Sequence, residues 1–162
     1  MSMETGQLPH KKPKAGGRTC VYRVFAEYIL VMHSGNSPAD DEWADLVRAF
    51  RESDLKNLRI LVFTYGGAPS ARQRAAINNV LRDHEPRIAI MTPSAFARAV
   101  GTAMTWFNPH MALFGPDQLS EAMKHLGSPE HDRPRLRLVL SELERELERL
   151  SGAPPARAGI RM

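Results

Sequence analysis

The chain has 162 residues, of which 43% are hydrophobic and 25% charged, as is typical of one soluble globular domain with tails. Its single cysteine, Cys20, excludes an internal disulfide and favours a reducing compartment. No stretch approaches the roughly 20 consecutive apolar residues of a membrane helix, and the N-terminus lacks the apolar core of a signal peptide, so we expect a cytoplasmic protein without a transmembrane segment.

The net charge of +4 is uneven, because basic residues crowd the first 18 positions, where Glu4 is the only acid. These basic residues are Lys11, Lys12, Lys14 and Arg18. Such a segment can touch nucleic acid or an acidic surface. No aromatic side chain is interleaved with the lysines for base stacking, however, so there is no specific nucleic-acid signal. Because it also lacks an apolar period, we interpret 1–18 as a disordered basic tail.

The first structured elements are predicted between residues 20 and 50. Residues 20–33 are rich in β-branched and aromatic side chains and predict two short strands, or one bent strand, with a break at Ala26-Glu27. A helix is then expected to begin with Ser37 as its N-cap and Pro38 at its first position. Its apolar side chains recur at helical spacing on a single face. They are Trp43, Leu46, Val47 and Phe50.

The middle of the chain alternates apolar runs with helical patterns. Residues 58–65, LRILVFTY, are a nearly continuous apolar run, as expected for a strand buried on both faces. Helices of this length between strands imply right-handed crossovers and a largely parallel sheet, so the fold class is α/β with the order ββαβαβαβα. The further elements expected are a helix over 69–82, a strand over 87–92, a helix opened by Thr92-Pro93, a strand over 110–115, and a helix opened by Pro116 and closed by Gly127.

After Gly127 the sequence changes character. Residues 128–133 are interpreted as a linker and 134–151 as one amphipathic helix, while 152–162, rich in Pro, Ala and Arg, are expected to form a disordered tail. The helix carries a leucine seam at heptad spacing. The seam consists of Leu136, Leu140, Leu143, Leu147 and Leu150. It fits a helix that packs on its own domain, and the alternative is a helix that joins two copies of the chain or docks on a partner.

The segment TYGGAPSARQR, residues 64–74, joins the central strand to the next helix. If Pro69 is the first helical residue, the N-cap is Ala68, which has no side-chain acceptor for the free amides of the helix. Arg72 and Arg74 lie near the same end, where cations are unfavourable, and the combination describes an anion site. The alternative is a helix that begins later, with Ser70 as its cap in an S-x-x-Q capping box.

Other chemistry has little support in the sequence. The phosphate-loop patterns G-x-x-x-x-G-K-[ST] and G-x-G-x-x-G are absent, as is the G-x-S-x-G of a serine hydrolase. The histidines lack metal-ligand spacing, so we expect no metal, no cofactor and no catalytic residue. His33, Ser34 and Asn36 follow a strand and are expected to share one edge of the sheet with Thr64 and Thr92.

The strand–helix order over residues 21–127 resembles the STAS superfamily, in particular its SpoIIAA-like branch. The segments that carry the resemblance are ILVFTYGGAPSARQRAAINNVL, RIAIMTPSAFARAVGTAMTWFNP and MALFGPDQLSEAMKHLG. The resemblance implies a domain over 19–127, with a small sheet covered by helices mainly on one side, no cofactor and no catalysis. It also implies a signalling module of the anti-anti-sigma type, in which phosphorylation of a Ser or Thr after the central strand releases a protein partner.

In this chain the phosphorylated position falls on Ser70, although the usual Asp-Ser-Ser/Thr-Gly context is replaced by Ala68-Pro69-Ser70-Ala71. SpoIIAA-like relatives further imply a lipid ligand. We therefore expect a non-enzymatic binding module that engages a protein partner, or a small anionic or lipid ligand, through the 64–74 loop. The alternative is a scaffold protein that acts through the leucine-seam helix and the basic tail. The predicted binding residues are Thr64, Gly66, Gly67, Ser70, Arg72, Arg74, Thr92 and Ser94.

Overall fold

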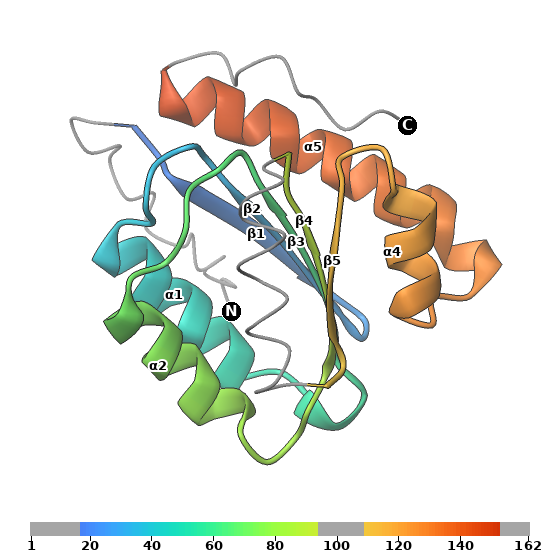
Figure 1. Cartoon of the computed structure of the whole chain (residues 1–162). Helices are drawn as coiled ribbons and strands as arrows, with labels where there is room; N and C mark the ends of the chain where they lie inside the picture. Colours follow the sequence, from blue (N-terminus) through green and yellow to red (C-terminus); the bar gives the residue numbers. More distant parts are fainter. Residues whose placement is uncertain (1–16, 94–108, 153–162) are drawn as a thin grey trace, which may run out of the picture.

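The computed structural model describes residues 17–93 and 109–152, which form one sheet flanked by helices (Figure 1). The strands of this part are β1 (Cys20–Phe25), β2 (Tyr28–His33), β3 (Arg59–Thr64), β4 (Arg87–Met91) and β5 (Met111–Phe114). Its helices are α1 (Asp40–Arg51), α2 (Ala71–Leu81), α4 (Leu119–His125) and α5 (Arg133–Ser151), with the short 3-10 turns η1 (Leu55–Asn57) and η2 (Glu130–Asp132). The helix expected after Thr92-Pro93 falls outside the described residues.

The strands lie side by side in chain order, β1-β2-β3-β4-β5. β1 and β2 form an antiparallel hairpin that turns at Ala26-Glu27, where Ala26 takes the left-handed φ of 47°. The break expected within residues 20–33 therefore divides two strands. β2 to β5 run parallel, each paired with the next strand in the sequence. The expected α/β class with a largely parallel sheet is confirmed in this part of the chain.

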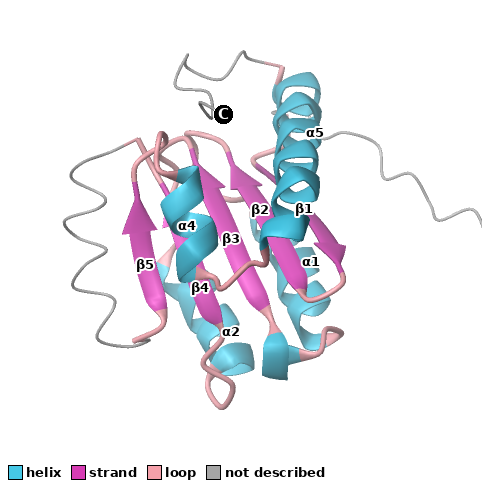
Figure 2. Ribbon diagram, turned by 90° about the vertical axis from the view of Figure 1, so that its right-hand side faces the viewer, coloured by secondary structure: helices cyan, strands magenta, loops and turns pink. Residues whose placement is uncertain are grey.

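Helices cover both faces of the sheet, which corrects the expectation that they lie mainly on one side. α1 and α2 pack on one face, while α4 and α5 pack on the other (Figure 2). The central strands supply apolar side chains to both faces in alternation. Ile29 and Ile60 join the core under α1 and α2, whereas Leu30 and Leu61 join the core under α4 and α5.

The leucine seam of α5 packs against the sheet of its own chain. Leu136, Leu140, Leu143 and Leu147 are buried, and the half-buried Leu150 packs against the same core. Of the two possibilities for this seam, the structure shows the intramolecular one, so these leucines are not a free oligomerisation surface. The expected linker is shorter than 128–133, because the turn η2 leads directly into α5 at Arg133.

α1, α2 and α4 begin two or three residues after the prolines expected to open them. α1 begins at Asp40, and its N-cap position, Ala39, makes no side-chain capping bond. The amide of Ala39 instead donates to Oγ1 of Thr19, at 2.9 Å, so a residue just before β1 supplies the acceptor expected from Ser37. Pro38 thus lies in the turn before the helix.

Candidate functional site

The loop after β3 is held against the loop after β2 at the carboxyl edge of the sheet. Thr64 Oγ1 donates to the carbonyl of Gly67 at 2.6 Å and accepts the amide of Gly66 at 3.1 Å. The amide of Gly67 in turn donates to the carbonyl of Ser34 at 3.1 Å. A Cβ at Gly67 would lie 2.0 Å from the carbonyl oxygen of Asn36, so only glycine allows the two loops to approach this closely.

Ser70 is the N-cap of α2. Its Oγ accepts the amide of Gln73 at 3.2 Å, and Oε1 of Gln73 accepts the amide of Ser70 at 2.9 Å, which completes a capping box. The later start of the helix is therefore the correct one, and the prediction that Ala68 leaves this helix uncapped is wrong. Because Ser70 caps α2, no anion is needed in place of a missing cap.

Gln73 also joins the starts of α1 and α2. Its side chain is buried, and Nε2 donates to the carbonyl of Pro38 at 2.8 Å and to Oδ1 of Asp40 at 2.9 Å. Its own carbonyl accepts Nε1 of Trp43 at 2.7 Å. Sequence reasoning found Gln73 only as the last position of S-x-x-Q, because the other partners lie at least thirty residues away in the chain.

The two arginines of the segment differ in how they are held. Nη1 of Arg74 donates to the carbonyl of Pro69 at 2.8 Å, which fixes a guanidinium beside the residue that precedes Ser70. Arg72 is exposed, and none of the described carboxylates pairs with it. Ser70 is exposed as well. This end of α2 therefore presents a hydroxyl, a helix N-terminus and two positive charges to the surroundings.

His33 ends β2 on the same edge, directly beside Thr64 in the sheet register. Its ring is buried and stacks on Trp43 with 5.7 Å between ring centroids, and Nδ1 has no hydrogen-bond partner in the described structure. Burial lowers the pKa of His33 to about 4, so the ring is neutral near neutral pH. Thr92 is buried at the end of β4, while Ser94 lies outside the described residues.

Tyr65 connects the loop after β3 to α5. Its hydroxyl donates to a carboxylate oxygen of Glu144 on α5, and its ring meets Phe63 edge-to-face at 4.9 Å. Burial, with the hydrogen bond to Glu144, raises the pKa of Tyr65 well above its ordinary value, so the hydroxyl remains a donor. The loop that carries Ser70 is thus fixed to α5, a helix that the STAS resemblance does not cover.

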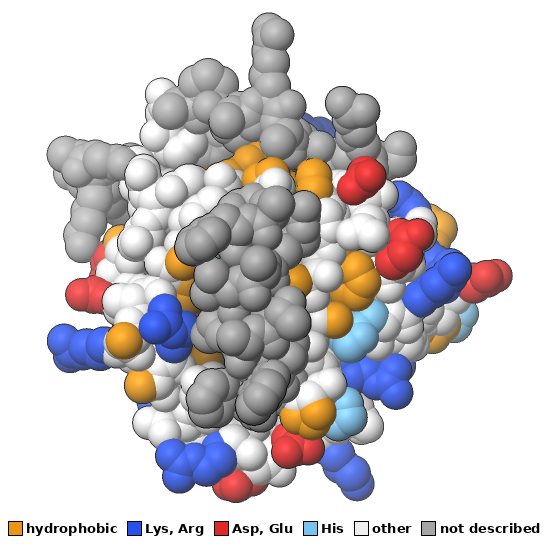
Figure 3. Space-filling view, viewed as in Figure 1, with side chains coloured by type: hydrophobic (Ala, Val, Ile, Leu, Met, Phe, Trp, Pro, Cys, Tyr) orange, Lys and Arg blue, Asp and Glu red, His pale blue; other side chains and the backbone are white. Residues whose placement is uncertain are grey.

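The described residues give three further findings. None of the helices in 17–93 and 109–152 has the length and apolar character needed to cross a bilayer. The same residues hold no group of three or more His, Cys, Asp or Glu side chains that could bind a metal ion. On the face shown in Figure 3, positive and negative side chains are intermixed over the visible described surface.

Comparison of the chain with known protein families, with curated proteins and with solved structures found no match. What can be said of its activity therefore comes from its own residues.

Proposed function

We propose that this protein is a cytoplasmic, non-enzymatic signalling module of the STAS type, which binds a protein partner through the carboxyl edge of its sheet. The contact surface in this proposal is the exposed part of the two adjoining loops, 34–37 and 66–70, with the first turn of α2. The main support is the position of Ser70, an exposed N-cap on a loop that hydrogen bonds and a close glycine contact hold in place.

Phosphorylation of Ser70 is the proposed switch. A phosphoryl group on this hydroxyl would stand at a helix N-terminus, where negative charge is favourable, beside the guanidinium that the carbonyl of Pro69 holds. It would also place about two negative charges in the middle of the proposed contact surface. A partner that fits the unmodified surface would then bind more weakly, because it would have to remove water from the phosphoryl group and contact its negative charge.

Aspartate and asparagine at position 70 separate charge from capping. Both residues cap helices as well as serine does, so Ser70→Asn keeps α2 intact and neutral while Ser70→Asp adds a charge. We expect both variants to keep the unfolding temperature close to that of the wild type, and only Ser70→Asp to lose the partners that wild type and Ser70→Asn capture from a lysate. Identical partner sets for all three proteins would rule out the switch.

A small anionic or lipid ligand at the same edge is the second form of this proposal, and Arg72 and Arg74 are the residues that would bind it. A thermal-shift screen with inorganic phosphate, nucleotides and vesicles of acidic lipid tests it. The expected result is stabilisation of the wild type that is lost in Arg72→Ala/Arg74→Ala. The scaffold alternative has less support, because the leucines on which it relied pack inside the chain.

A further inference from the structure

β1 is an edge strand whose middle has unpaired backbone groups. Successive residues of an antiparallel strand direct their backbone groups alternately toward the partner strand and away from it. The carbonyl of Thr19 accepts the amide of Ser34 across the hairpin at 2.8 Å, whereas the next amide, that of Cys20, points away from β2 and donates to Oε2 of Glu42 at 2.9 Å. By this alternation Tyr22 and Val24 also direct their amides and carbonyls outward, and no described group bonds to them.

Among the described residues, those that cover this edge do so only at its start. Oε2 of Glu42 accepts the amide of Thr19 at 3.0 Å, its hydroxyl at 2.6 Å and the amide of Cys20. Just before these residues, the amide of Arg18 donates to the carbonyl of Leu150 at 2.9 Å. Side-chain cover of this kind protects natural sheet edges from unwanted pairing. It stops at Cys20, and the side chain of Val24 further along is 43% exposed.

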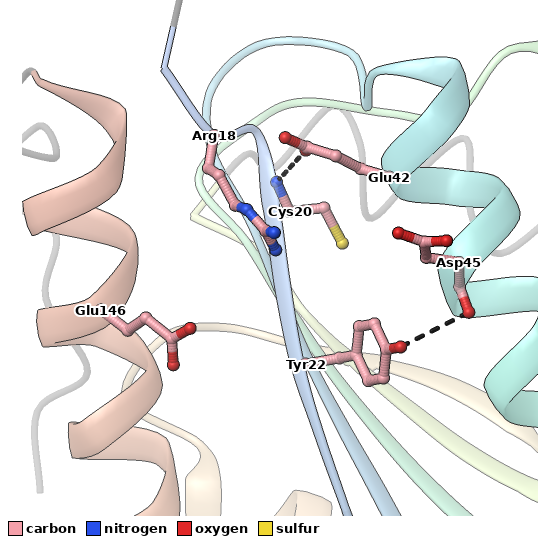
Figure 4. Close-up of a pocket in the computed structure, with 6 residues that line it drawn as sticks. All are labelled: Arg18, Cys20, Tyr22, Glu42, Asp45 and Glu146. Atoms are coloured by element: carbon pink, nitrogen blue, oxygen red, sulfur yellow. Dashed lines mark hydrogen bonds between the residues drawn. The ribbon is translucent and has the colours of Figure 1, made fainter. Parts of the chain in front are cut away.

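A pocket of about 270 Å³ opens beside this edge, with α1 on one side of β1 and α5 on the other (Figure 4). It is lined by Arg18, Cys20, Tyr22, Glu42, Asp45 and Glu146. These residues bring three carboxylates and a single guanidinium. Burial raises the pKa of the Cys20 thiol to about 12, so the sulfur is uncharged and adds no negative charge to that of the carboxylates.

Within 17–93 and 109–152, two of the carboxylates are held only by exposed ion pairs. Asp45 accepts Arg48 at 2.8 Å and Glu146 accepts Arg23 at 3.2 Å, and the side chains of both arginines are close to half exposed or more. Exposed pairs of this kind contribute little to stability, so their loss costs little. A positive side chain that enters the pocket can therefore take the place of either arginine.

We propose that the open edge of β1 binds an extended, lysine- or arginine-bearing segment of a partner protein as an added strand. The backbone of the segment pairs with Tyr22 and Val24, and a basic side chain reaches the carboxylates of the pocket. A second copy of this chain fits less well, because a symmetric pairing of two β1 edges repeats the same charges around one axis. This surface shares no residue with the Ser70 site and does not depend on the proposed function.

The test uses the full chain and a labelled peptide, Thr-Lys-Val-Lys-Val-Thr. Fluorescence anisotropy measures its binding, and amide hydrogen exchange follows Tyr22 and Val24. We expect the peptide to bind and to slow exchange of both amides at least about tenfold, because they become strand hydrogen bonds. The acidic peptide Thr-Glu-Val-Glu-Val-Thr, and the basic peptide with N-methyl groups on alternate residues, should bind at least about tenfold more weakly.

Two variants of Val24 keep the test decisive if one of them folds poorly. Val24→Pro removes an outward amide that the β1–β2 ladder does not use, and Val24→Lys repels a basic peptide while leaving the backbone intact. Both should abolish binding of the basic peptide. Unchanged binding to Val24→Lys would overturn the proposal. So would Tyr22 and Val24 amides that are already protected without peptide, whether by the chain's own basic tail or, if protection rises with protein concentration, by a second copy.

Discussion

The imidazole of His33 shows how burial controls the protonation of one side chain. The ring is 4% exposed and stacked on Trp43, and no described side chain donates a hydrogen bond to it or accepts one from it. A charged ring at this position would lose its hydration without gaining a partner, so the pKa falls from 6.5 to about 4. The folded protein therefore holds His33 neutral at a pH where the unfolded chain already protonates it.

We expect the free energy of unfolding to fall as the pH drops from 6.5 toward 4. Above this window His33 is neutral in both states and its contribution is fully present, whereas within the window only the unfolded state binds the proton. A shift of this size is equivalent to about 3 kcal/mol by the lower end of the window. Urea unfolding at about pH 7, about 5.5 and about 4.5 measures the effect.

Two variants assign this pH dependence to the ring. His33→Phe keeps an aromatic ring on Trp43 but cannot bind a proton, so its unfolding free energy should lose less as the pH falls. His84→Gln changes an exposed histidine and should follow the wild type. Equal pH slopes for the wild type and His33→Phe would show that other groups cause the dependence.

At the scale of elements, α5 is a structural part of the domain. We expect Leu143→Ala to lower the free energy of unfolding by about 2–5 kcal/mol, because the fully buried side chain leaves a cavity between α5 and the sheet. Leu138 is 55% exposed on the same helix, and Leu138→Ala should change stability by less than about 0.5 kcal/mol. Urea unfolding of both variants tests the contrast. Equal losses of unfolding free energy in the two variants would contradict the burial of the leucine seam within the single chain.

Local periodicity predicted the apolar faces of the helices well. All four apolar residues assigned to α1 are buried, as are Leu119, Ala122, Met123 and Leu126 near the end of the domain. The helix starts were placed too early, because Pro38, Pro69 and Pro116 suit the preceding turn as well as the first helical position. The acceptor that serves the amide of Ala39 comes from Thr19, and no local pattern indicates a partner so distant in the chain.

The number of covered faces was misjudged for a different reason. The continuous apolar run of β3 predicted a strand buried on both faces, and this is what the structure shows, whereas the family resemblance implied helices mainly on one side. Right-handed crossovers place α1 and α2 on a common face. α4 follows the last strand and connects to no further strand, so the handedness of crossovers does not determine which face of the sheet α4 covers. The contacts of Gly67 and Gln73 at the site also join residues that are distant in the chain, and sequence alone did not show them.

At the scale of the whole molecule, the sheet separates two apolar cores that depend on different parts of the chain. One core lies under α1 and α2, whose sequences fall between the strands they connect. The other lies under α4 and α5, which follow the last strand. α5 covers β1 and β2 at the far end of the sheet from β5, so the chain must return across the sheet to complete its second core (Figure 2).

A chain that ends after Ser128 should therefore fail to form the native domain, because it lacks the helix that covers Val21, Leu30 and Leu61. Apolar area of this extent is not left exposed by stable monomers, so we expect the shortened chain to aggregate and to lose cooperative unfolding. Sedimentation velocity and near-ultraviolet circular dichroism measure the two effects. A chain that ends after Gly152 keeps α5 and should match the full chain in both. A shortened chain with native-like dichroism and a sharp unfolding transition would instead make α5 a dispensable addition, and would return its leucine seam to consideration as a surface for binding another molecule.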